Sequence, residues 1–176
     1  MPETQGVRMD FKPREMIVHP AHGVGRVVRV VARQFDDRSV QDYYEISISG
    51  GTVWVAVGDP DHGLRRVTQQ TGLAQYRNLL KSRPEPLASD NRQRKSDLAE
   101  RMKEATFKAR CEILRDLWGQ RSIKPLDESC NNLLKRVHEL LCGEWAAADG
   151  SSIEEAAREV DALLVEGQGV YGNSGA

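Results

Sequence analysis

Short runs of β-branched and aromatic residues, partly alternating with polar ones, fill residues 16–67 of the chain. Five runs stand out, and they read MIVHP, VGRVVRVVARQF, YYEISIS, TVWVAV and LRRV. Clusters of glycine, aspartate and proline separate them, as turns require. The pair Gly50-Gly51 favours a two-residue hairpin with a primed turn, because glycine adopts positive φ at little cost. The pattern predicts five strands in a small, strongly bent sheet or barrel.

After Val67 the apolar positions recur at three and four residues, which is typical of amphipathic helices. Asp127 is a candidate N-cap, Gly150 a candidate helix stop, and Ser152 with Glu155 a candidate capping box. The predicted fold class is therefore α+β, with a β domain at 11–67 followed by an all-α domain at 68–166. Low apolar content predicts mobile tails at 1–10 and 167–176.

The 176-residue chain has a formal net charge of only -1, but its charges are unevenly distributed. Residues 1–67 carry nine basic and nine acidic side chains, residues 68–121 carry twelve and seven, and residues 122–176 carry four and ten. Local charge governs attraction to a polyanion. The basic middle is therefore where a nucleic-acid contact is expected, although exposed helices also carry many cations without binding anything.

The sequence holds no pattern typical of an enzyme. It has no GxSxG, HExxH or P-loop motif, and the glycines at 23–25 lack the third glycine and the helix of a dinucleotide site. His19, His22 and His62 fall in turns without the further ligands that zinc needs. His138, inside an apolar stripe, is interpreted as a packing or rim residue. We expect no catalytic residue, no metal and no cofactor.

The cysteines and the lengths of the apolar runs indicate the cellular compartment of the protein. Cys111, Cys130 and Cys142 form no CxxC pair and fall in predicted helices, which fits buried thiols in a reduced compartment. No run approaches the roughly 18 apolar residues of a membrane span, and the first residues do not form an export signal. These features predict a cytoplasmic protein without a membrane partner, and a monomer is the default.

The basic middle segment arranges some of its cations on one side of a predicted helix. Arg92, Lys95 and Lys103 fall within a narrow arc, because steps of three and eight residues nearly close whole turns. Arg94 and Arg101 border this stripe, whereas Leu98 and Met102 lie about a quarter-turn away and can face the bundle. Three phosphate contacts would give a salt slope of about -2.7, so binding by the stripe alone would be weak. An ordinary solvated face remains the alternative.

Several segments together resemble the CarD/CdnL family of bacterial transcription regulators. FKPREMIVHPAHGVGRVV is similar to the family's opening, and Gly63-Leu64-Arg65 and the helical ILRDLW at 113–118 follow in order, so that the resemblance covers about 11–164. It implies an N-terminal Tudor-like (SH3-like) RNA polymerase-interacting domain, shared with the transcription-repair coupling factor, that binds the polymerase β subunit. It also implies a helical domain that binds promoter DNA at the upstream edge of the bubble, stabilises the open complex and catalyses nothing.

The resemblance also implies positions for the contacts. Arg33, at the end of the second strand, and Trp54, in the fourth, would face the polymerase, although Trp54 could equally fill the core of a small barrel. Arg92 and Lys95 match the family's phosphate contacts, and we group Arg94 and Lys103 with them as DNA-binding residues.

Two positions depart from the family: Trp54 stands where some relatives have arginine, and the serious departure lies just before the basic run. Many relatives carry a tryptophan wedge just before the basic run, and here that residue is Asp90, so we expect weaker stabilisation of open complexes. Trp118 does not replace the wedge, because its apolar stripe predicts a core position. The expected partners are the polymerase β subunit and promoter DNA through non-specific phosphate contacts, with a place at the nucleoid through the polymerase. The alternative is a polymerase-binding adaptor or competitor that does not touch DNA.

Overall fold

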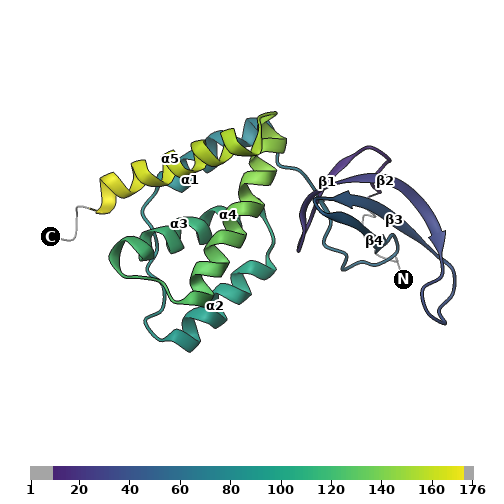
Figure 1. Cartoon of the computed structure of the whole chain (residues 1–176), viewed down its shortest axis with the longest axis horizontal. Helices are drawn as coiled ribbons and strands as arrows, with labels where there is room; N and C mark the ends of the chain where they lie inside the picture. Colours follow the sequence, from purple (N-terminus) through teal and green to yellow (C-terminus); the bar gives the residue numbers. More distant parts are fainter. Residues whose placement is uncertain (1–9, 173–176) are drawn as a thin grey trace, which may run out of the picture. The chain divides into compact units, whose positions relative to one another are not determined.

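The computed structural model describes residues 10–172, and the chain divides after Val67 into two compact units. The N-terminal unit is an antiparallel sheet whose strands are joined in the order β4-β3-β2-β1-β5 (Figure 1). The strands are β1 (Met16–His19), β2 (Gly23–Arg33), β3 (Gln41–Ile48), β4 (Gly51–Ala56) and β5 (Arg65–Arg66). The five predicted strands are thus confirmed.

The sheet is bent but open. Within the described residues β4 and β5 are the two edges and do not pair with each other, so the barrel that the sequence suggested is not closed. A small core lies against one face, formed by buried residues that include Phe11, Ile17, Val27, Tyr44, Ile46 and Leu64. The Tyr44 hydroxyl accepts a hydrogen bond from the Phe11 N–H (3.2 Å), which ties the entering chain to the middle of the sheet.

The β3–β4 hairpin differs by one residue from its prediction. Ile48 pairs with Gly51, so the two-residue turn consists of Ser49 and Gly50. Only Gly50 has a positive φ (94°), which is the requirement of a type II turn and not of the primed turn that was predicted. Gly51 is the first residue of β4.

The C-terminal unit is helical and is shown with its helices labelled in Figure 1. A 3₁₀ turn (Gln70–Gly72) leads into α1 (Leu73–Lys81), and α2 (Asn91–Lys103), α3 (Phe107–Ile123), α4 (Glu128–Asp149) and α5 (Ile153–Tyr171) follow. The predicted caps are confirmed: Asp127 caps α4 by accepting from the Cys130 N–H, Gly150 ends α4 in the left-handed conformation, and Ser152 and Glu155 form the capping box of α5. The α+β fold class is therefore confirmed.

A single apolar core holds the helices together. It includes Leu73, Leu114, Leu117, Val137, Leu141, Trp145, Val160 and Leu164. Trp118 was expected in this core, but it lies at the edge, partly exposed, because its indole N–H donates to Gln168 Oε1 (3.2 Å). The three cysteines are buried and none forms a disulfide. Over residues 10–172, no helix has the length and apolarity needed to cross a membrane.

Helix α5 continues further than its sequence suggested. Residues 167–171 were assigned to a mobile tail, yet they form the last turns of α5. Gly167 is buried against the end of α1, where a Cβ atom would lie 2.8 Å from the Lys81 carbonyl oxygen. This close approach explains why residue 167 is a glycine. The remaining expected tail residues, 1–9 and 173–176, lie outside the described part.

Candidate binding surfaces

The outer face of the sheet carries the first candidate surface. In the β3–β4 pairing Glu45 lies opposite Trp54, and in the β2–β3 pairing Arg29 lies opposite Glu45, so these three side chains form a row across three strands. Arg29 donates to the Glu45 carboxylate (2.6 Å). The residues that alternate with them, such as Tyr44 and Val53, face the core. Alternation therefore directs Trp54 away from the core, and its exposed fraction is 39%.

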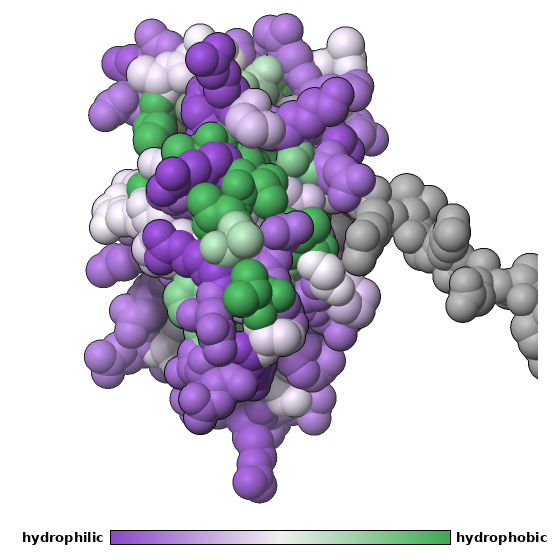
Figure 2. All heavy atoms as spheres, turned by 90° about the vertical axis from the view of Figure 1, so that its right-hand side faces the viewer, coloured by the Kyte–Doolittle hydropathy of each residue, from purple (hydrophilic) through white to green (hydrophobic). Residues whose placement is uncertain are grey.

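Two further aromatic rings and one arginine gather around Trp54, at the end of this row. The rings of Phe35 and Tyr43 meet edge to face at 4.9 Å, and Phe35 lies 6.5 Å from the Trp54 ring. The Arg33 guanidinium lies over the Trp54 indole, 4.9 Å from its centre. We call Arg33, Phe35, Tyr43 and Trp54 the aromatic patch. Figure 2 shows hydrophobic side chains gathered among hydrophilic ones on the face that it views.

Phe35 and Tyr43 were not predicted as part of a surface. The period-two alternation that places Trp54 outside also places Tyr43 outside, so that signal was present in the sequence. Phe35 follows the end of β2, in a segment without periodicity, and only the fold brings it to Tyr43. Arg33 and Trp54, which were predicted together, do lie together. A stacked guanidinium and large exposed rings are typical of protein-binding sites.

Helix α2 carries the second candidate surface. Asp90 is its N-cap: the carboxylate accepts a hydrogen bond from the Gln93 N–H (2.8 Å). An aspartate is among the best residues for this position. Asp90 therefore has a structural role, as the N-cap of α2. Leu98 is the only apolar side chain of α2 that is fully buried, as the sequence predicted for this face.

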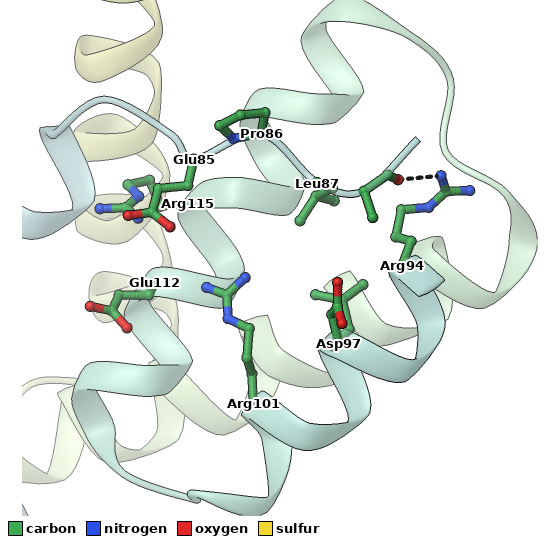
Figure 3. A pocket seen from close by; sticks show the side chains of 10 residues that line it. Glu85, Pro86, Leu87, Arg94, Asp97, Arg101, Glu112 and Arg115 are labelled. Atoms are coloured by element: carbon green, nitrogen blue, oxygen red, sulfur yellow. Dashed lines mark hydrogen bonds between the residues drawn. The ribbon is translucent and has the colours of Figure 1, made fainter. Parts of the chain in front are cut away.

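Arg94, which was grouped with the DNA-binding residues, is partly exposed and makes its hydrogen bonds within the helical unit. Its guanidinium donates to the Ala88 carbonyl oxygen (3.0 Å), shown as a dashed line in Figure 3, and to the carboxylate of Asp127 (3.1 Å). Hydrogen bonding to Asp127 raises the pKa of Arg94. The bond from the Cys130 N–H, together with Arg94, lowers the pKa of Asp127. Arg94 thus ties α2 to the preceding linker and to the start of α4.

Asp116 ties α2 to α3 at a second point. Its carboxylate is completely buried and accepts from Arg101 (2.7 Å), from Arg115 Nε (2.9 Å) and from the Glu85 N–H (2.9 Å). Arg115 also donates to the Ser82 hydroxyl (2.8 Å). These bonds join α2, α3 and the linker at 82–90. Sequence reasoning missed this cluster, because Arg101 was placed at the border of the cationic stripe and Arg115 was noted only as part of the ILRDLW segment.

Arg92 and Lys95 are the cations of α2 that remain available. Both are exposed, and no salt bridge joins either of them to a carboxylate among residues 10–172, although Lys95 lies near enough to Asp127 to help lower the pKa of that carboxyl. Lys103, from the same predicted stripe, lies 2.7 Å from Glu100, and both of these side chains are highly exposed. Such a surface pair contributes little to stability, but it offsets the charge of Lys103. The exposed cationic pair of α2 is therefore Arg92 and Lys95.

A cavity of about 350 Å³ lies between the linker and helices α2 and α3. Figure 3 shows Arg94, Arg101 and Arg115 around it, together with the carboxylates of Glu85, Asp97 and Glu112. Because cations and carboxylates alternate around its wall, the cavity has no excess charge that would select an ionic ligand. Its arginines are already engaged in the bonds that hold α2.

The helical unit places a cysteine and an aspartate beside a histidine. His138 Nε2 lies 2.7 Å from the Asp161 carboxylate, and the Cys142 sulfur is 3.7 Å from the same ring nitrogen. Burial raises the pKa of Cys142 to about 12, so its thiol stays protonated. Within residues 10–172, no group of three or more His, Cys, Asp or Glu side chains could hold a metal ion.

The described structure thus offers two candidate surfaces, one on the β sheet and one on helix α2. Two family models match the chain: the CarD-like/TRCF RID domain over residues 11–68 and the CarD C-terminal domain over residues 75–161. The chain therefore belongs to the CarD family. These domains indicate a transcription regulator that interacts with RNA polymerase, and they point to a factor without enzymatic activity.

Proposed function

We propose that this protein binds the β subunit of RNA polymerase through the aromatic patch and contacts upstream promoter DNA through α2, thereby changing the lifetime of the open complex. In this proposal residues 11–67 form the polymerase-interacting domain and residues 68–166 the DNA-contacting domain. The observation that carries the DNA contact is the exposure of Arg92 and Lys95 without ion-pair partners on a helix whose inner arginines are engaged.

The aromatic patch supports the polymerase contact. Trp54 and Phe35 are exposed large hydrophobic side chains, and the guanidinium of Arg33, itself an exposed residue, lies over the Trp54 ring. Trp, Tyr and Arg are the residues most often found at the energetic centre of protein interfaces. A stacked arginine loses little conformational entropy on binding, which favours affinity.

The charge of α2 sets the strength of the DNA contact. Two phosphate contacts give a salt slope of about -1.8, smaller than the value for the three contacts that the sequence suggested. Binding by α2 alone is weak, and attachment to the polymerase raises the effective concentration of DNA near the helix. Asp90 supplies no wedge and adds a negative charge beside phosphate. Open complexes are therefore stabilised less than by relatives with a tryptophan at this position.

The DNA contact can be tested with the double variant Arg92→Ala/Lys95→Ala. We expect weaker binding to duplex DNA, a salt slope smaller in magnitude by about 1.8, and a loss of the effect on open-complex lifetime, while polymerase binding is retained. The matched control is Lys108→Ala/Arg158→Ala, which removes the same charge from exposed sites on α3 and α5. If the first variant behaves like the second, the adaptor or competitor function without DNA contact is the better explanation.

The polymerase contact can be tested separately in the full chain. Arg33→Ala/Trp54→Ala should abolish capture of the isolated polymerase β subunit, and Val165→Ala, an exposed apolar residue of α5, is the control. Equal capture by the two variants would show that the aromatic patch is not the contact. Circular dichroism melting of each variant checks that the sheet is intact.

A further inference from the structure

The turn between α3 and α4 exposes an apolar side chain among cations. Ile123, the last residue of α3, has an exposed fraction of 84%, the highest among the large exposed apolar side chains of the described chain. Arg121 precedes it and Lys124 follows it, and both are exposed. Neither cation has an ion-pair partner among residues 10–172.

This turn is held firmly. The Arg121 guanidinium stacks on the Trp118 ring (4.4 Å from its centre), and the Trp118 indole is fixed by its hydrogen bond to Gln168. At Gly119 a Cβ atom would lie 2.6 Å from Pro84, so the end of α3 packs directly on the linker that leads to α2. Stacking limits the rotamers of Arg121 before any ligand arrives.

The same turn is joined to the basic helix. Ile123 stands four residues before Asp127, whose carboxylate is 3.1 Å from the Arg94 guanidinium near the start of α2. Lys95 also lines an open cavity of about 470 Å³ with Asp127 and Glu128. Glu128 is an exposed carboxylate here, whereas Asp127 is already engaged by Arg94. The α3–α4 turn and Lys95 of α2 thus lie on neighbouring parts of the helical unit.

We propose that Ile123, Lys124 and Arg121 form a second DNA contact, in which Ile123 inserts between bases at the minor-groove side while the two cations bind the flanking phosphates. This rests on the proposed function, because α2 must bring DNA to this region. Charge complementarity favours DNA over an apolar protein segment, since the exposed isoleucine is bracketed by cations. Apolar side chains flanked by Arg and Lys are the usual means of unstacking a base step.

The test uses the full chain and a duplex that carries 2-aminopurine beside a short pre-melted bubble. Binding of the wild-type protein should raise the fluorescence, because an unstacked 2-aminopurine is brighter. Ile123→Ser should remove this rise and weaken binding about tenfold, as expected when an isoleucine side chain leaves an interface, without changing the salt slope. Lys124→Ala should reduce the slope by about 0.9. Val170→Ser, which alters an exposed apolar residue of α5, is the control.

The outcomes separate this inference from the proposed function. If Ile123→Ser and Lys124→Ala both bind as the wild type does while Arg92→Ala/Lys95→Ala binds more weakly, the second contact is wrong and the α2 contact stands. If no variant changes DNA binding, both are wrong. An equal loss of fluorescence with Val170→Ser would also overturn the assignment, because the effect would then not belong to this turn.

Discussion

Replacement of Asp116 by asparagine should loosen α2 from the helical unit. The buried carboxylate accepts three hydrogen bonds, from Arg101, Arg115 and the Glu85 N–H. An asparagine would keep one acceptor oxygen and would direct an NH₂ group at a donor. Arg115, which is itself buried, would at the same time lose its counter-ion.

The size of the effect follows from this burial. Removing one partner of a buried ion pair costs about 3–5 kcal/mol. Arg101→Gln removes only the partly exposed partner and leaves Asp116 paired with Arg115, so it should cost about 1 kcal/mol. Because a domain of this size shifts its Tm by about 4–8 °C per kcal/mol, Asp116→Asn should lower the Tm of the helical unit by more than about 10 °C.

Two measurements check this. Thermal unfolding followed by circular dichroism gives the change in Tm, and amide hydrogen exchange shows whether α2 opens before the other helices. Asp97→Asn, at an exposed carboxylate of α2, is the control and should change stability by less than about 0.5 kcal/mol. The reasoning is refuted if Asp116→Asn is no more destabilising than Arg101→Gln, or if exchange in α2 is unchanged.

Two further predictions concern single residues. Gly167→Ala should destabilise the helical unit by about 1–3 kcal/mol, because its methyl group would clash with the end of α1. Gly169→Ala, in the same helix but with open space at its Cβ position, should stabilise it by up to about 1 kcal/mol in urea unfolding. Burial, together with His22, lowers the pKa of His19 from its ordinary 6.5. The folded sheet therefore binds fewer protons than the unfolded chain, and its stability should fall as the pH drops below about 6.5. His19→Asn can accept the same backbone hydrogen bonds without titrating, and its melting temperature should show a smaller pH dependence.

Features encoded locally were predictable from the sequence. The five strands, the N-cap at Asp127, the stop at Gly150 and the capping box at Ser152 each depend on a few neighbouring residues. The prediction placed the β3–β4 turn one residue too late in the chain. The reason is that two adjacent glycines do not show which of them adopts the positive φ.

The sequence did not predict in the same way which charged side chains stay in solvent and which bond to other helices. Arg92 and Arg94 are two residues apart and chemically identical, yet one remains in solvent and the other bonds to Asp127. The difference arises because Asp127, at the start of α4, lies beside Arg94 in the folded unit. A local sequence pattern does not show this proximity. Trp118 likewise reads as a core residue by periodicity, but Gln168, fifty positions away, holds it at the edge.

The small apolar contribution of α2 has a consequence for how it meets a ligand. With Leu98 as its one fully buried apolar side chain, the helix gains little from the hydrophobic effect and depends on directional polar bonds for its position. Such an element exchanges between docked and partly opened forms at a low free-energy cost. Contact with a polyanion would then restrict this motion, so that part of the binding energy is spent on ordering the helix, and substitutions that pre-order it should tighten the complex without adding a contact.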